Sequence, residues 1–170
     1  MRARVFMSLA ALGLAVSGCA TVAPPAPERT VTEGAGPVPE PVPDHDWFFN
    51  IDGDTAHMAY GLAESDDLRL GMNCRRASGR LELATVAENG AAAEIHVESG
   101  GETERFPARS EPSEVHDGVF LVADARTTEP VFQRFRRVGW IAQWRDGRRD
   151  AYAPHPESAA NIERFFAFCG

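Results

Sequence analysis

Six arginines and two tryptophans lie close together between residues 134 and 149, and they are the residues of this chain best suited to bind a ligand. The set consists of Arg134, Arg136, Arg137, Trp140, Trp144, Arg145, Arg148 and Arg149. A guanidinium group binds a carboxylate or phosphate through two parallel hydrogen bonds and also stacks on aromatic rings. The spacing therefore predicts a binding patch for an anionic ligand or an acidic partner protein. The alternative is a solvated surface whose charge is neutralised by the chain's own acidic residues.

The motifs of catalytic and metal sites are missing from the sequence. Its five histidines have none of the spacings with which His, Cys and Glu hold zinc, and no GxSxG nucleophile elbow occurs. The chain also contains no lysine, which excludes mechanisms that need a lysine amine. We therefore predict no catalytic residue, no metal site and no cofactor. An active site assembled only by folding is the alternative.

The beginning of the chain has the pattern of an export signal. Two arginines precede an apolar run over residues 5–16, which is shorter than the roughly 20 residues that a membrane-spanning helix needs. The run ends in Val16-Ser17-Gly18-Cys19, which resembles the lipobox of bacterial lipoproteins. The alternative is an ordinary secretory signal followed by an incidental cysteine.

The resemblance to lipoproteins implies a processing route and a location. Residues 1–18 would be removed as a signal peptide, and Cys19 would become the lipidated first residue that attaches the protein to a membrane. In such lipoproteins an Asp after the cysteine often marks retention in the inner membrane, and this chain has Ala20. The expected location is therefore the outer membrane, with the folded part facing the periplasm.

Composition limits the organisation and the partners of the chain. There are 17 basic and 25 acidic residues, a net charge of −8, which disfavours nucleic acid as a partner. Residues 20–45 contain seven of the twelve prolines and show no helical or strand period, which is typical of an extended linker. We therefore predict a lipidated, proline-rich tether over residues 19–45 and one globular domain over residues 46–170.

Hydrophobic alternation and turn residues predict a mainly β domain of the α+β class, an antiparallel sheet or sandwich. A strong hairpin signal, Asp52-Gly53, separates the first two predicted strands, and Asp146-Gly147 separates the last two. The strands are expected at 47–51, 55–60, 68–74, 81–86, 92–99, 102–108, 119–123, 140–145 and 148–152. A short helix is expected near 129–138, before Gly139, and a C-terminal helix near 156–169.

Two cysteines remain for a disulfide if Cys19 carries the lipid. Cys74 falls on the apolar face of the strand at 68–74, and Cys169 falls on the apolar stripe of the C-terminal helix. An oxidising periplasm would join them, and the bridge would dock the helix on that strand. Two separate buried thiols, or half of a metal site, are the alternatives.

Two further resemblances concern the mature domain. The stretches Tyr60–Cys74 and Ile162–Cys169 are similar to a pattern in exported proteins of alphaproteobacteria, a similarity that implies no activity. Ser99-Gly100 resembles the loop motif with which membrane-bound inhibitors of c-type lysozyme enter the enzyme's cleft. The sequence thus predicts a non-catalytic envelope lipoprotein that binds an envelope component, such as a lipopolysaccharide phosphate or a peptidoglycan carboxylate, or a partner protein. Inhibition of a lytic enzyme such as lysozyme is the second function, and a cryptic enzyme is the third.

Overall fold

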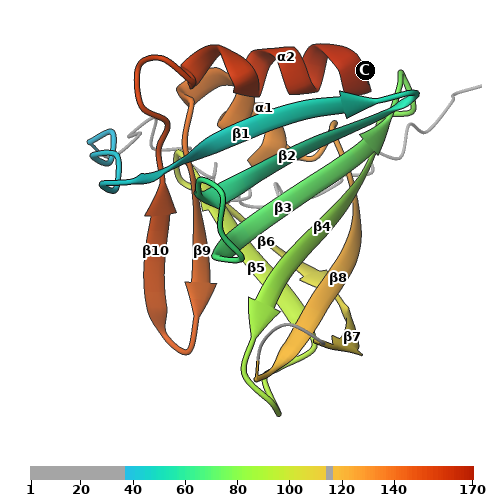
Figure 1. The fold of residues 1–170 in the computed structure, drawn as a ribbon, viewed down its shortest axis with the longest axis vertical. Coiled ribbons are helices and arrows are strands. Elements are labelled where there is room, and N and C mark those ends of the chain that lie inside the picture. Colours follow the sequence, from blue (N-terminus) through green and yellow to red (C-terminus); the bar gives the residue numbers. More distant parts are fainter. Residues whose placement is uncertain (1–36, 114–116) are drawn as a thin grey trace, which may run out of the picture. The chain divides into compact units, whose positions relative to one another are not determined.

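A computed structural model describes residues 37–113 and 117–170. The described residues belong to one compact unit, and they form ten strands and two helices in two antiparallel sheets (Figure 1). The α+β, mainly β class with a disulfide-docked C-terminal helix is thereby confirmed. The whole predicted signal peptide and residues 19–36 of the predicted tether, including Cys19, lie outside the described residues.

The larger sheet has six strands in the order β1-β2-β3-β4-β8-β7. Its strands are β1 (His45–Asp52), β2 (Thr55–Leu62), β3 (Leu68–Arg75), β4 (Arg80–Ala87), β7 (Arg109–Pro112) and β8 (Val119–Arg126). Alternate side chains of β2, β3 and β4 are buried, as expected for strands with one face on a core. The first hairpin turns at Gly53 and Asp54, because Asp52 pairs with Thr55. The prediction of Asp52-Gly53 as the turn was wrong by one residue.

The smaller sheet has four strands in the order β10-β9-β5-β6. They are β5 (Glu94–Ser99), β6 (Glu102–Pro107), β9 (Ile141–Arg145) and β10 (Arg148–Tyr152). Arg145 pairs with Arg148, and the residues between them, Asp146 and Gly147, both have positive φ, as a tight two-residue hairpin turn requires. The predicted hairpin turn at Asp146-Gly147 is confirmed.

Two helices cover one end of the space between the sheets (Figure 1). Helix α1 (Pro130–Val138) packs on β5 and β6 and ends at Gly139, which adopts the left-handed conformation.

Helix α2 (Ala159–Cys169) packs on β1 and β2 and is joined to β3 by the Cys74–Cys169 disulfide. The predicted bridge is confirmed, but the prediction that the helix docks on the strand of Cys74 was wrong, because its aromatic side chains pack on β1, where the Phe165 ring contacts Phe49. The helix begins three residues later than predicted, because the Asp46 carboxylate accepts hydrogen bonds from the Ser158 hydroxyl and from the His155 backbone N–H, which holds residues 156–158 outside the helix.

The core extends from the inner face of the larger sheet to the helices. Its largest fully buried side chains include Trp47, Tyr60, Phe132, Phe135, Phe165 and Phe166. Cys74 and Cys169 are bonded and lie within the same cluster. Three strands meet the helices at one end only. The end of β3, the end of β5 and the start of β4 lie near α1 and α2, so the start of β3, the start of β5 and the end of β4 lie away from them. The described structure is therefore filled at one end of the sheets and open at the other.

Candidate functional site

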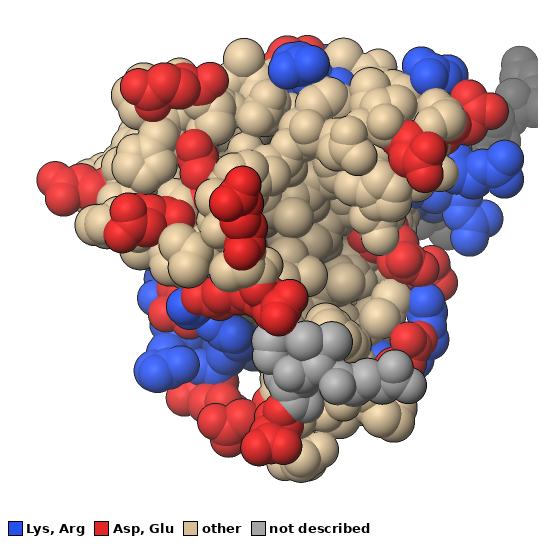
Figure 2. Space-filling model, viewed as in Figure 1, with Lys and Arg blue, Asp and Glu red and all other residues tan. Residues whose placement is uncertain are grey.

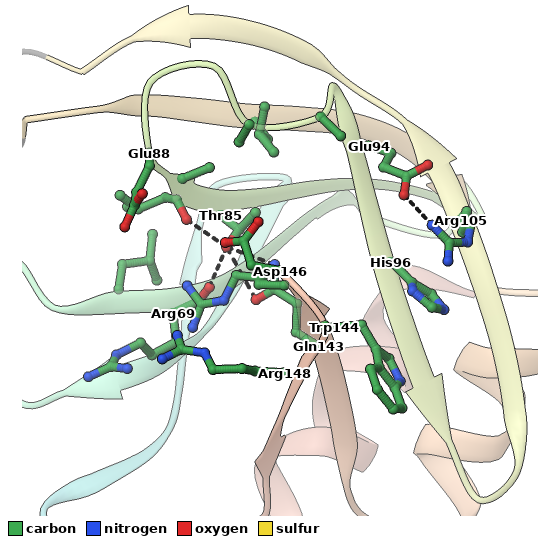
Figure 3. A pocket seen from close by; sticks show the side chains of 18 of the residues that line it. Arg69, Thr85, Glu88, Glu94, His96, Arg105, Gln143, Trp144, Asp146 and Arg148 are labelled. Carbon is green, nitrogen blue, oxygen red and sulfur yellow. Dashed lines mark hydrogen bonds and ion pairs between the residues drawn. The ribbon is translucent and has the colours of Figure 1, made fainter.

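The open end of the sandwich contains a pocket of about 1080 Å³, which we call the inter-sheet groove (Figure 3). One wall is formed by residues 66–69 at the start of β3, and a second by residues 85–92 at the end of β4 and in the loop after it. Residues 143–148 of the β9–β10 hairpin form a third. Leu68, Val86 and Leu121 give the groove an apolar lining, and charged side chains surround its mouth.

Thr85 and Gln143 form a polar floor between the two sheets. The Thr85 hydroxyl donates to the Arg69 carbonyl oxygen over 2.7 Å, and Gln143 Nε2 donates to Thr85 Oγ1 over 3.0 Å. Behind them, the Tyr152 hydroxyl donates to Gln143 Oε1 over 3.1 Å. All three side chains are buried, and burial raises the pKa of Tyr152 to about 12. The phenol is therefore a neutral donor at physiological pH, and the floor is a fixed polar surface.

An ion pair between Asp67 and Arg69 lies on the wall formed by the start of β3. Arg69 donates from Nε and Nη2 to the two carboxylate oxygens of Asp67, over 2.5 and 2.8 Å. The His45 ring contacts the same carboxylate at 3.1 Å. The hydrogen bonds from Arg69, with a smaller contribution from His45, lower the pKa of Asp67 to about 2. This carboxylate is thus ionised and already committed to internal partners.

Arg145 and Arg148 are opposite each other at the end of the β9–β10 hairpin and line the groove. Directly opposed residues of an antiparallel pair project from the same face. Because side chains alternate along a strand, Arg145 shares its face with Gln143, so both arginines lie on the face that the smaller sheet turns toward the larger one. Arg145 Nη2 pairs with Asp150 over 3.0 Å. Among the described residues, the Arg148 side chain has no hydrogen bond or ion pair.

The other side of the mouth is acidic and aromatic. Glu88 and Asp117 line it and are exposed, and Glu94 is paired with Arg105. The Trp144 indole stacks on the His96 ring with centroids 5.9 Å apart. Burial, followed by repulsion from Arg105, lowers the pKa of His96, which favours its neutral form. Charged side chains of both signs thus line the groove on each side, with Glu94 beside Arg105 on one and Asp67 beside Arg69 on the other.

The structure does not bring the eight residues of the predicted Arg/Trp patch together. Arg134, Arg136 and Arg137 lie on α1, which contacts the Gly100 end of β5 through Arg134. Arg145 and Arg148 lie at the far end of the hairpin, near the opposite end of β5, because Trp144 pairs with His96. Six residues of strand extend about 20 Å, so the set is divided into two groups.

Several members of the set are neutralised within the protein. Arg136 donates to both carboxylate oxygens of Glu163, and Arg149 donates to both oxygens of Glu98. Glu98 also accepts a hydrogen bond from the Trp144 indole over 2.8 Å. The hydrogen bonds from Arg149 are the main reason why the pKa of Glu98 is lowered. Figure 2 likewise shows basic and acidic side chains interleaved at the lower left of the domain.

Trp140 is buried beside Arg149, whose guanidinium carbon lies 5.2 Å from the Trp140 ring centroid. It belongs to a small apolar cluster with Ala142 and Ala153. Trp140 is thus a packing residue, while Trp144 at the mouth of the groove is the more accessible indole. Of the predicted patch, three residues line the groove, namely Trp144, Arg145 and Arg148.

Ser99, the residue compared with the inhibitor loop motif, is buried. Its hydroxyl donates to the Trp140 carbonyl oxygen over 2.7 Å, and its exposed fraction is 0%. Gly100 lies against the Arg134 side chain. The β5–β6 turn is thus packed beneath α1, and neither residue is presented on a projecting loop.

Other sequence expectations concern metals and membranes. Within the described ranges there is no group of His, Cys, Asp or Glu side chains that could hold a metal ion. The same ranges contain no helix long and apolar enough to cross a membrane. Cys19 and the rest of the lipobox are outside the described residues. No protein-family model, no curated protein and no solved structure matches this chain.

Sequence reasoning missed most of the groove. Arg69, Thr85 and Gln143 come from three separate strands, and none lies in a recognisable motif. One signal was present in the alternation of β9, where the polar Gln143 and Arg145 share a face with the buried Ile141. Two polar residues on the inward face of a strand indicate a polar cavity or a site.

Proposed function

We propose that this protein is a non-catalytic lipoprotein of the bacterial envelope, anchored through Cys19 in the outer membrane, whose domain binds an envelope component in the inter-sheet groove. The observation that carries the proposal is the groove itself, a cavity of about 1080 Å³ at the open end of the sandwich. Ligand sites are commonly concave, with apolar walls and a few convergent polar groups. The groove has this composition.

The state of the polar groups around the groove supports binding. The floor residues are already hydrogen-bonded to each other, so they provide a rigid surface with a fixed pattern of donors and acceptors. Asp67, with its pKa of about 2, is held as an anion by Arg69. These features favour recognition of a ligand over transfer of its protons, because a general acid or base works best with a pKa near the working pH.

The location of the groove suits a tethered binding domain. The groove is at the ends of β3, β4 and β9, whereas α2 and the disulfide are at the opposite ends of the strands. Helix packing and the bridge therefore stabilise the fold without occupying the ligand site. A ligand can enter from solvent between residues 88–92 and the β9–β10 turn, since both segments line the mouth.

The test is capture of envelope components by the full-length lipidated protein and by two matched variants. Ala92 lines the groove, while its exposed neighbour Ala93 does not. We expect Ala92→Trp to fill part of the mouth and abolish capture, and Ala93→Trp to leave it unchanged. Captured material would be identified by mass spectrometry after extraction from the protein's own membranes.

Three outcomes would contradict the proposal. If both variants retain the same components as the parent protein, the groove is not the binding site. If both lose them equally, the loss reflects the loop and not the groove. If the purified protein converts the captured component to a product, the protein is an enzyme, as the third sequence-based function holds.

A further inference from the structure

We infer that the hairpin wall of the groove is an oxyanion subsite, in which Arg145 and Arg148 hold the carboxylate or phosphate of an amphipathic ligand whose apolar part lies along the groove. This inference rests on the proposed function, because it specifies the ligand chemistry of the same site. The ligand is a small molecule with one anionic head group and an apolar chain.

The first argument is the direction of the two arginines. They are opposite each other in the register of β9 and β10, on the face that carries the buried Gln143. Arg148 is exposed and so remains hydrated at the mouth of the groove, where its guanidinium group is accessible to a ligand, while Arg145 is half-buried. Inside the described structure, the space in front of both residues is the groove.

The second argument is the balance of charge around this wall. Three guanidinium groups line this side of the groove, namely that of Arg69 at the start of β3 and those of Arg145 and Arg148 on the hairpin, and Figure 3 shows Arg69 and Arg148 on the same side of the pocket. Asp67 neutralises Arg69 and Asp150 neutralises Arg145. Among the described residues, no carboxylate pairs with Arg148. Arg148 is thus the guanidinium group on this side that no described carboxylate pairs. Carboxylates without an ion pair within the described ranges also line the groove and make its lining acidic overall, namely those of Asp66, Glu88, Asp117 and Asp146.

The charged neighbours Arg145 and Asp146 leave the Arg148 guanidinium group unpaired within the described structure. Arg145 contacts Asp150 through Nη2 alone, so Nη1 is left as a donor for an oxyanion, whereas its Nε is buried without a hydrogen-bond partner among the described residues and has almost no accessible surface. Asp146 is exposed in the turn between the arginines. In Figure 3 its carboxylate points toward the loop wall, away from the Arg148 guanidinium group.

The third argument is the apolar surface that continues from this wall. Leu68, Val86 and Leu121 line the groove beyond the arginines. An anion without an apolar part would leave this surface in contact with water, whereas an alkyl chain would cover it at a gain of about 25 cal/mol per Å². The groove is therefore suited to a ligand with both parts.

Titration calorimetry on the full chain carrying Cys19→Ala, purified without detergent, tests the inference. The probes are octanoate, octyl phosphate, octanol and acetate. We expect octanoate or octyl phosphate to bind at least tenfold more tightly than octanol or acetate, and the preference between the two identifies the head group. Arg148→Gln should weaken this binding by about ten- to a hundredfold, because a charge-assisted hydrogen bond is lost. Arg145→Gln should also weaken it.

Arg137→Gln is the matched control, because Arg137 is an exposed arginine on α1 and does not line the groove. Arg137→Gln should bind the octyl anions as the parent does.

The inference is overturned if no octyl anion binds, if octanol binds as tightly as octanoate, or if Arg148→Gln and Arg137→Gln behave alike. Envelope capture that depends on Ala92 but not on Arg148 would overturn the oxyanion subsite and leave the proposed function standing. Octanoate binding that depends on Arg148, without capture that depends on Ala92, would overturn the proposed function and leave the oxyanion subsite standing.

Discussion

Cys74 and Cys169 are joined by a disulfide, with their Cα atoms 5.7 Å apart, although 95 residues separate them in the sequence. The bridge connects the end of β3 to the last residue of α2. The backbone reinforces it, since Ala77 and Gly79 of the β3–β4 turn donate to the carbonyl oxygens of Phe168 and Cys169. The C-terminus is therefore fastened to the end of the sandwich opposite the groove.

Loss of the bridge should destabilise the protein without changing the ligand site. We expect Cys169→Ser to lower the free energy of unfolding by about 2–5 kcal/mol, because the unfolded chain gains the freedom of a long loop. Urea denaturation of the oxidised protein measures this change. The double variant Cys74→Ser, Cys169→Ser should match the single variant. Equal stability of the parent and the single variant would show that the bridge does not support the fold.

The sequence predicts this part of the molecule well, because each cysteine lies within a clear local period. Cys74 ends an alternating strand, and Cys169 ends a helical stripe with Ile162, Phe165 and Phe166. Burying both apolar faces brings the sulfurs into one layer. By contrast, β7 was not predicted, because all four of its residues are exposed and one is proline, so it has no alternation to detect.

The groove was harder to predict because it depends on tertiary structure. Arg134 and Arg148 are close in the sequence, yet α1 and the β9–β10 turn place them at opposite ends of β5. A local cluster of arginines therefore did not correspond to one surface. What separates Arg148 from Arg136 and Arg149 is the absence of a partner among the described residues, and pairing across distant elements is not visible in a sequence.

Membrane attachment depends on Cys19 in the proposed function. We expect Cys19→Ala to move the protein from the washed membrane fraction to the soluble fraction, because acyl chains on this residue would provide the anchor. Fractionation followed by immunoblotting measures the distribution. A conservative control is Ala20→Ser, which leaves the cysteine in place. Retention of Cys19→Ala in washed membranes would reject the lipoprotein assignment.

The two tyrosines of the chain, Tyr60 and Tyr152, should ionise only at high pH in the folded protein. Burial raises the pKa of both phenols, and that of Tyr152 to about 12. An unfolded tyrosine ionises near pH 10, so the unfolded state releases these protons first. Stability should therefore fall as the pH rises from about 10 toward 12. Phenolate absorbance should titrate near pH 10 in urea and well above it in the native protein.

Tyr152→Phe measures how much the hydrogen bond from Tyr152 in the groove floor contributes to the stability of the protein. The variant removes the donor to Gln143 Oε1, and we expect a loss of about 1–3 kcal/mol at neutral pH, because the single proton of the Thr85 hydroxyl is already donated to the Arg69 carbonyl oxygen and Gln143 Oε1 is left without a donor among the described residues. The native phenolate titration should then retain one component instead of two. A remaining component near pH 12 would contradict the assignment of that raised pKa to Tyr152.

The ion pair between Asp67 and Arg69 should stabilise the fold in a pH-dependent way. The folded pKa of Asp67 is about 2, below the value of about 3.9 for an unfolded aspartate. The stabilisation is therefore fully present above about pH 4 and is lost as the pH falls toward 2. Because the side chains of Asp67 and Arg69 are 38% and 39% exposed, solvent screening limits the contribution to about 1 kcal/mol or less.

Asp67→Asn tests this expectation through the difference between its urea midpoint and that of the parent protein. The difference should be largest near pH 6 and should close as the pH approaches 2, because the parent aspartate is then protonated as well. Asp66→Asn is the matched control, since Asp66 is an exposed neighbour without an ion pair among the described residues. High salt should reduce the effect at pH 6, because exposed charges are screened. A difference that stays constant from pH 6 to pH 2 would show that Asp67 acts through packing and not through its charge.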